Sequence, residues 1–504
     1  MSSSISASEQ RARVRDGLTS GARRSLATMA VAALLAPILY ALLVLFQLGS
    51  WHGADWWLRD IITLRRALYA DITRAMPPDA RKTVIIAGSG SLFGVNGGLI
   101  TKATGTETLG FGLHAGLDLD LLLANASRSI DANDQVVLPL EFEIYNRPRP
   151  TDLSAANFLA YFYKDAGEIP PSHLPALLLA AQPVTVFEGV VDRVAQLFGK
   201  PTGFKLDEAT VLERWKNAQA DPAALQASER YYDYFNLDAH GDKVLMRLTP
   251  PSAEAEAQAF RSPAADAISP YTIEMLDDWR ADLAKRGAAM FLTWPIMIED
   301  DAGTIVTEQH WQRLIDFARL ADAKGQPLYC DPVAAVIPVQ YRFDTVYHVN
   351  YKGSLLYSAG LADCLKDVAA KPFDWRNANA AALAEAARQR LAALKAPPDP
   401  LVFGYERNLR QLQALHAAIE ATRAATGRYP DVLPPFDAAI PVMEMGAAPF
   451  APTYRSDGTD FALTVAGKDE CYTVREGWPQ LVHPAGSEDG TCRYGFWSAG
   501  AANW

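Results

Sequence analysis

The sequence predicts an α/β protein with a parallel sheet, preceded by one membrane-spanning helix and followed by a small α+β domain. Three observations lead to this prediction. The 23 residues from Leu26 to Leu48 carry no charge. A buried-type strand at 83–87 is followed by a helical run and by a second strand at 135–141, a spacing that favours a parallel sheet. A Pro-rich break at 396–400 then precedes a segment with one amphipathic helix and several short strands.

The composition is that of an ordinary globular protein and excludes several classes. The 504 residues are 49% hydrophobic and 21% charged, with a net charge of -11, which excludes collagen-like, disordered and polytopic membrane proteins. An acidic chain is a poor candidate for binding nucleic acid, because that affinity comes largely from clustered basic residues. Four cysteines without CxxC spacing and scattered histidines without HExxH do not predict a metal site.

The apolar segment Leu26–Leu48 determines the expected location. At 1.5 Å per residue it crosses a hydrocarbon core of about 30 Å, and a membrane helix tolerates the internal Pro37. Arginines dominate residues 1–25, so the positive-inside rule predicts a single-pass inner-membrane anchor with a cytoplasmic N-terminus and a periplasmic remainder. A cleavable signal peptide is the alternative, but its apolar core would span only about 7–15 residues. Interfacial tryptophans follow the segment (Trp51, Trp56 and Trp57).

Export permits disulfides. Cys471 and Cys492 flank a turn-rich segment, and a bridge between them would contribute on the order of 3 kcal/mol by closing a short loop. Cys330 and Cys364 are a second pair, whose pairing the sequence leaves open.

The α/β pattern extends over residues 49–375. Residues 147–285 within it are less regular and rich in Pro, Tyr and Asp, so we expect an insertion or lid region there. The regular pattern resumes with a strand at 289–294 and helices at 308–323 and 353–368. Residues 376–403 are expected to be a helical linker.

Residues 404–504 are expected to form a separate α+β domain. Apolar residues follow one stripe of a helix that ends near Thr426, with Gly427 as its C′ residue. Short strands are expected at 460–465, 471–474 and 494–497.

Ser89 and Ser91 are the first candidates for chemistry, in the turn that leaves the strand at 83–87. A hydroxyl at the carboxyl end of a parallel strand faces a crevice, and N–H groups at a helix start can stabilise an oxyanion. The alternatives are a polar turn that caps a helix and a dinucleotide loop, although the GxGxxG spacing is not met.

Asp344 and His348 are the second candidates, ahead of the helix at 353–368. A nucleophilic serine needs an imidazole to take its proton and a carboxylate to hold that imidazole in the right tautomer. Other residues have two interpretations. His114 caps a helix or borders the site, while Glu141 and Glu143 line the crevice or end a strand.

In the order of these residues the chain resembles the SGNH/GDSL hydrolase superfamily. It is most similar to the exported, membrane-anchored branch related to alginate O-acetyltransferases and to the D-alanyl-transfer protein of teichoic acid synthesis. Residues 87–91, Ala-Gly-Ser-Gly-Ser, resemble the small-x-Ser-x-Ser block, with Ser89 as nucleophile and Ser91 as its rival. Gly112 resembles the second block, whose N–H joins the oxyanion hole. The third block supplies an Asn, and residues 138–143 contain none.

The resemblance implies a flavodoxin-like parallel sheet sandwiched by helices. It also implies a Ser-His-Asp acyl-ester transferase or esterase that acts on an exported or cell-surface polysaccharide and needs no cofactor. Ser89 would attack, His348 would serve as base and Asp344 would orient it. A membrane-bound acyltransferase is an implied partner.

The C-terminal segment resembles the soluble part of a type II secretion pseudopilin. The similarity is carried by the helix to Thr426, by Gly-Arg-Tyr-Pro at 427–430 and by Tyr-Arg-Ser-Asp-Gly-Thr-Asp-Phe at 454–461. Such a domain implies contact with secretion or export components. The alternative function is therefore a non-catalytic envelope scaffold that binds glycan and docks such a machine. The missing Asn favours the scaffold, and the pair Asp344 and His348 favours the enzyme.

Overall fold

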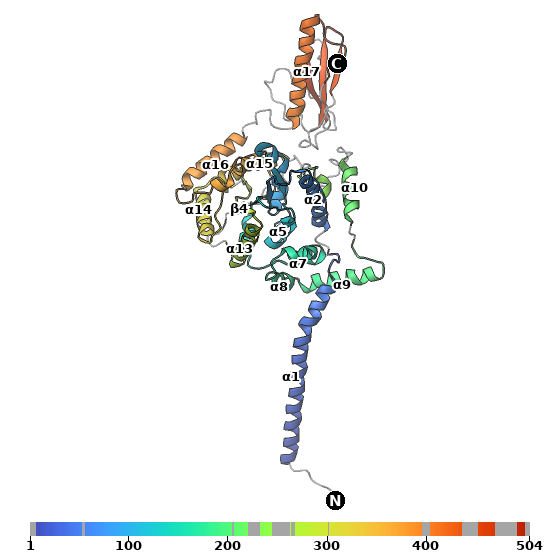
Figure 1. The fold of residues 1–504 in the computed structure, drawn as a ribbon, viewed down its shortest axis with the longest axis vertical. Helices are drawn as coiled ribbons and strands as arrows, with labels where there is room; N and C mark the ends of the chain where they lie inside the picture. The colour runs from blue at the N-terminus through green and yellow to red at the C-terminus, as the bar shows by residue number, and fades with distance from the viewer. Residues whose placement is uncertain are drawn as a thin grey trace. The chain divides into compact units, whose positions relative to one another are not determined.

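The computed structural model describes residues 7–52, 56–203, 206–219, 232–243, 263, 268–300, 302–395, 404–435, 452–468 and 491–498 (Figure 1). The chain forms two compact units, one of Met1–Trp56 with Arg149–Lys205 and one of Trp57–Pro148 with Leu206–Trp504. The strands are β1 (Lys82–Ile85), β2 (Glu107–Gly110), β3 (Gln135–Leu138), β4 (Ala289–Leu292), β5 (Met297–Ile298), β6 (Val336–Ile337), β7 (Thr453–Ser456), β8 (Phe461–Lys468) and β9 (Thr491–Trp497).

The helices account for most of the described chain. They are α1 (Ala7–Phe46), α2 (Trp56–Ala75), α3 (Ser89–Gly94), α4 (Gly97–Thr104), α5 (Leu119–Ser127), α6 (Phe142–Tyr145), α7 (Asp152–Ala160), α8 (Leu174–Leu179), α9 (Pro183–Leu197), α10 (Glu208–Gln219), α13 (Pro270–Lys285), α14 (Glu308–Ala323), α15 (Tyr351–Leu365), α16 (Ala380–Lys395) and α17 (Gly404–Thr426). Short 3-10 helices lie at 162–168, 234–236, 304–306, 332–335, 339–341 and 368–370.

The first unit is built on the long helix α1. Its segment Ser25–Phe46 has a mean hydropathy of 2.6 and is long and apolar enough to cross a membrane. Large apolar side chains along it are exposed, among them Leu34 and Leu45. Pro37 lies inside α1 without ending it. The expected N-terminal apolar helix is therefore present.

The second unit contains the predicted parallel sheet, which is confirmed. Its strand order is β2-β1-β3-β4, and all pairings are parallel. Strands β1 and β3 are buried along their whole length, as expected for a parallel sheet covered by helices on both faces. Helix α15 packs on α3 and α4, while α13 packs on α5 and β4. Leu328 adds one parallel bridge beside Leu292.

Strand β2 is a correction to the sequence prediction, which placed no strand there. The chain crosses from β1 to β2 through α3 and α4. The helical run expected between the strands at 83–87 and 135–141 is α5, which leads from β2 to β3. The strand escaped prediction because it has only four residues, Glu-Thr-Leu-Gly, too few and too polar to form an apolar run.

Helix α16, which falls in the segment 376–403, packs on α14. Three of its apolar residues are buried, Ala384, Ala387 and Leu391. The Arg390 guanidinium donates hydrogen bonds to the carbonyls of Val336 and Ala334, at 3.0 and 2.8 Å. The helix expected in the segment 376–403 is thus present as α16, and it is attached to the α/β body.

The C-terminal segment forms a helix against an antiparallel sheet of order β7-β8-β9 (Figure 1). Leu412, Leu415 and Ile419 of α17 share one buried cluster with Phe461 and Leu463 of β8. The strands expected at 460–465 and 494–497 are present as parts of β8 and β9. The strand expected at 471–474 lies outside the described residues.

A disulfide joins Cys330 to Cys364, with an S–S distance of 2.06 Å and a Cα–Cα distance of 5.6 Å. It ties the segment after Leu328 to α15. The sequence left open whether Cys330 and Cys364 pair, and the structure shows that they do. The bridge between Cys471 and Cys492 stays a prediction, because Cys471 lies outside the described residues.

Candidate active site

Three candidate residues follow the carboxyl ends of three neighbouring strands. Ser89 follows β1, Gly112 follows β2 and Glu141 follows β3. Ile85, near the end of β1, is in register with Gly110 on one side and with Val137 on the other. The chain leaves β1 toward β2 and later returns to the other side of β1 as β3. Ser89 thus lies where the strand order reverses, the usual position of a ligand crevice in an open α/β sheet.

The turn at Ser89 is held tightly from both sides. A Cβ on Gly88 would lie 2.5 Å from the Cα of Ala115, so this close approach requires glycine. The Glu141 carboxylate accepts hydrogen bonds from the N–H of Gly88 at 3.1 Å and of Gly90 at 2.6 Å. The side chain of Ser89 is partly exposed, whereas Ser91 is only 5% exposed.

Glu141 is fully buried beneath this turn. Burial raises the pKa of its carboxyl group, although the bonds from Gly90 and Gly88 favour the charged form. Its carboxylate links the segment after β3 to the start of α3, so Glu141 has a structural role here. Neighbouring Glu143 accepts a hydrogen bond from the Tyr347 hydroxyl at 2.8 Å.

Asp344 and His348 lie side by side in a tight hairpin. The Phe343 N–H donates to the His348 carbonyl at 2.8 Å, and Arg342 forms an antiparallel bridge with Val349. This turn brings Asp344 Oδ1 to 2.7 Å from His348 Nδ1. The His348 side chain is 8% exposed and that of Asp344 is 31% exposed. The carboxylate thus fixes one ring nitrogen of a largely buried imidazole.

Helix α3 connects this pair to the serine turn. The ring of Phe93 stacks on the His348 imidazole, with centroids 4.3 Å apart. Ser89 precedes Phe93 by four residues, so both project from the same face of the helix. A Cβ placed on Gly90 would lie 3.5 Å from the Cβ of Tyr347. The serine turn and the hairpin at 343–348 are therefore neighbours.

The structure does not join all parts of the predicted triad by hydrogen bonds. In the described part of the chain, neither Ser89 nor Ser91 bonds to His348, and Nε2 of His348 has no hydrogen-bond partner. Among the same residues, the N–H groups of Ser89 and Gly112 donate no hydrogen bond. A Cβ on Gly112 would lie 2.2 Å from the Leu92 nitrogen, so Gly112 packs directly on the backbone of α3.

His114 both closes a turn and borders the site. Its Nδ1 accepts a hydrogen bond from the Gly116 N–H at 2.8 Å. Burial lowers the pKa of its imidazole, and the nearby charges of His348 and Arg147 lower it further. The Trp57 ring packs edge-on against His114, with centroids 5.9 Å apart.

Tyr232 is a site residue that the sequence reasoning missed. Its hydroxyl donates a hydrogen bond to Oδ2 of Asp344, the oxygen that does not face His348. Burial raises the pKa of this hydroxyl, as does its bond to Asp344. The ring also packs edge-on against Phe93 at 5.1 Å and against Trp57 at 6.0 Å. Tyr232 belongs to the expected insertion, where no motif or spacing distinguishes it from the neighbouring tyrosines.

Lys243 also lies near the Phe93 ring. Its ammonium group is 5.3 Å from the centroid of the Phe93 ring. Burial lowers the pKa of Lys243 to about 7, and the Arg65 charge contributes in the same direction. Residues 232–243 therefore supply both a hydroxyl and a buried amine to the surroundings of Phe93.

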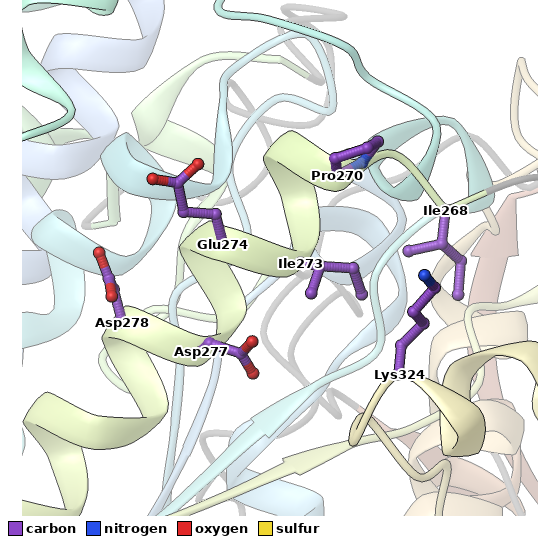
Figure 2. Close-up of a pocket in the computed structure, with 7 residues that line it drawn as sticks. All are labelled: Ile268, Pro270, Ile273, Glu274, Asp277, Asp278 and Lys324. Atoms are coloured by element: carbon purple, nitrogen blue, oxygen red, sulfur yellow. The ribbon is translucent and has the colours of Figure 1, made fainter.

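A separate pocket of about 430 Å³ lies along α13 and contains none of the candidate catalytic residues. Figure 2 shows Lys324 pointing toward Ile268, whereas the Glu274 and Asp278 side chains project elsewhere from α13. Within the described residues, no group of three or more His, Cys, Asp or Glu side chains could hold a metal ion. The pocket is lined by Ile268, Pro270, Ile273, Glu274, Asp277, Asp278 and Lys324.

No protein-family model matches the sequence, and no curated protein is similar enough to count as a relative.

Proposed function

We propose that this protein is a membrane-anchored serine acyl-ester transferase or esterase of the SGNH type, acting on an exported or cell-surface polysaccharide. The observation that carries the proposal is the pair Asp344 and His348, 2.7 Å apart, with its imidazole stacked on Phe93 of the helix that begins at Ser89. An oriented imidazole next to a serine at the switch point of a parallel sheet is the arrangement that activates a hydroxyl.

The first half of the reaction forms an acyl-enzyme. Asp344 accepts a hydrogen bond from the Nδ1–H of His348, which holds the tautomer whose unprotonated Nε2 can act as a base. Ser89 Oγ attacks the acyl carbonyl while its proton passes to Nε2. The N–H groups of Ser89 and Gly112 stabilise the negative charge on the carbonyl oxygen. The leaving alcohol then takes the proton from Nε2 as its bond to the carbonyl carbon breaks.

The second half releases the acyl group. A sugar hydroxyl or water attacks the acyl-Ser89 ester and gives its proton to Nε2 of His348. The bond to Ser89 Oγ breaks, and Oγ recovers the proton from Nε2. The acceptor decides between transfer and hydrolysis, so both reactions use the same residues.

Ser89 is the proposed nucleophile, and Ser91 is the rival. Ser89 is partly exposed and shares the helix face of Phe93, whereas Ser91 is buried. Ser91 also lies two residues further along α3, and side chains at that spacing do not share a face.

The proposed setting is the periplasmic side of an inner membrane. The apolar helix α1 supports a single-pass anchor, and the arginines among residues 1–25 support a cytoplasmic N-terminus. A membrane-bound acyltransferase is the proposed donor of acyl groups. The helix α17 and its antiparallel sheet are proposed as a pseudopilin-like domain that contacts secretion or export components.

The second candidate function is a non-catalytic envelope scaffold that binds glycan. Two observations favour it. The Gly90 N–H, at the start of α3, is engaged by Glu141, and the segment 138–143 offers no Asn as a third oxyanion donor. A scaffold would retain glycan binding without turnover.

An ester assay separates the two functions. The full chain in detergent micelles is given a chromogenic acetyl ester, beside Ser89→Ala, Ser91→Ala and His348→Ala. We expect a loss of at least about 100-fold for Ser89→Ala and His348→Ala, with Ser91→Ala close to the wild type. Equal rates in all four proteins would reject the enzyme, and retained glycan binding would then favour the scaffold.

A further inference from the structure

Helix α9 carries an apolar stripe on its exposed side. Five apolar residues follow one another at spacings of three and four, which places them on one face of a helix. They are Val184, Phe187, Val191, Val194 and Phe198. These side chains are 40% to 77% exposed. Two further apolar side chains of this part of the chain are exposed, Leu197 of α9 at 70% and Leu179 of α8 at 75%.

The opposite face of α9 is fixed to the end of α1. A Cβ on Gly189 would lie 1.8 Å from the side-chain oxygen of Gln47, so the two segments are in close contact. Asp192 is buried and accepts a hydrogen bond from the Trp51 N–H at 2.6 Å. Burial favours a higher pKa for Asp192, but the bonds from Trp51 and Thr202 outweigh it and lower the pKa. The apolar stripe is therefore the free side of a firmly anchored helix.

The position at which α9 meets α1 shows how deep the apolar stripe would lie in a membrane that α1 crosses. The Tyr40 hydroxyl donates to the carbonyl of Ala181, just before α9, at 3.3 Å. Tyr40 lies six residues before the end of the apolar segment at Phe46, or about 9 Å along the helix axis. Figure 1 shows α9 running across α1 rather than along it. The start of α9 is therefore level with the last turns of the apolar segment.

We infer that α9 lies in the plane of the membrane interface, with its apolar stripe inserted among the lipid acyl chains. An interfacial amphipathic helix buries its apolar face about 5–10 Å into the boundary between headgroups and acyl chains, and the depth of Ala181 matches this range. The occupant is the lipid bilayer because the stripe begins level with the last turns of α1, whose exposed apolar side chains themselves need lipid. This inference rests on the membrane anchor of the proposed function and not on its chemistry.

The arrangement gives the first unit two attachments to one leaflet. A single spanning helix can rotate about its axis, whereas α9 lying across it restricts that rotation. The residues that bind α9 to α1 therefore set the orientation of the first unit relative to the bilayer.

Photo-crosslinking to lipid tests the inference. The photoreactive amino acid benzoylphenylalanine is placed at Phe187 or Phe198 of the full chain, in nanodiscs of phosphatidylethanolamine and phosphatidylglycerol with an alkyne-tagged acyl chain. Leu35 in α1 serves as the positive control, and Lys366, the exposed residue directly after α15, serves as the negative control. We expect crosslinking from Phe187 and Phe198 to be within about threefold of that from Leu35, and at least about tenfold above that from Lys366, because only acyl chains carry the tag.

The two sources of failure are distinguishable. Crosslinking from Leu35 but not from Phe187 and Phe198 would leave the anchor in place and overturn the interfacial helix. No crosslinking from Leu35 would refute the anchor, and with it the basis of the inference. A dimer crosslinked through Phe187 would identify a second copy, rather than lipid, as the occupant of the stripe. Ester hydrolysis by the same proteins reports independently on the chemistry.

Discussion

The ring of Phe93 stacks on the imidazole of His348, with centroids 4.3 Å apart and ring planes inclined by 24°. Phe93 lies in the first helix after β1, and His348 lies about 255 residues further along the chain. This contact joins the serine turn to the Asp344 hairpin. It also gives the imidazole an apolar neighbour on one face, which limits how it can turn away from the turn at Ser89.

Tyr232→Phe should lower ester turnover by roughly tenfold or more, because a hydrogen bond to a charged group contributes about 1.5–3 kcal/mol. The hydroxyl holds Oδ2 of Asp344, so its loss frees the carboxylate to rotate away from His348. Tyr161→Phe, in the first unit, is the matched control. Unchanged turnover in Tyr232→Phe would show that Asp344 is positioned without this hydroxyl.

Gly112→Ala should abolish most of the activity and destabilise the fold by about 1–3 kcal/mol. The new Cβ would lie 2.2 Å from the Leu92 nitrogen and 2.5 Å from the Ser91 carbonyl carbon, so α3 must move with its serine. The comparison is Gly167→Ala, where no atom lies within 4 Å of the new Cβ. Turnover and the midpoint of urea unfolding are measured for both. Wild-type turnover in Gly112→Ala would contradict the close packing of Gly112 on α3.

The serine turn and the pair Asp344 and His348 were accessible from the sequence because each is local. A strand that runs into Gly-Ser-Gly-Ser and an Asp-x-x-x-His spacing can be read within a few residues. Tyr232 and Phe93 could not be found in this way, because their roles depend on contacts between segments more than 100 residues apart. Strand β2 was missed for a different reason, since four residues with a Glu and a Thr carry no periodicity.

The disulfide was likewise undetermined by the sequence, since Cys330 and Cys364 become neighbours only through the packing of α15.

Replacing both cysteines by serine should destabilise the protein by about 4 kcal/mol, the chain-entropy value for a loop of this length. Reducing the wild type with dithiothreitol should lower its urea midpoint as far as the double substitution does. If reduction leaves the urea midpoint unchanged, the disulfide does not stabilise the fold.

His310 should make the fold sensitive to acid. Its side chain is buried in α14, and burial lowers its pKa from 6.5 to about 4. Below pH 6.5 the unfolded chain therefore takes up a proton that the folded chain does not, which favours unfolding. The stability that the neutral, buried His310 contributes is therefore fully present above pH 6.5 and is lost as the pH falls toward 4. The free energy of unfolding should fall by about 2 kcal/mol between pH 7 and pH 5 from this group.

The replacement His310→Gln removes the titrating group. Urea midpoints at pH 7 and pH 5 should then differ less in the variant than in the wild type. His416→Gln in α17 is a control at a half-buried site. If the wild type and His310→Gln lost the same stability between the two pH values, His310 would not be the acid-sensitive group.

The activation of Ser89 by His348 is tested most directly by covalent labelling. The full chain in detergent is treated with a fluorophosphonate probe, in which an activated serine displaces fluoride, and the labelled peptide is identified by mass spectrometry. We predict one adduct at Ser89, formed at least about 100 times more slowly in His348→Ala and absent from Ser89→Ala. An adduct at Ser91 alone, or labelling of Ser89 at the same rate in His348→Ala, would contradict the account.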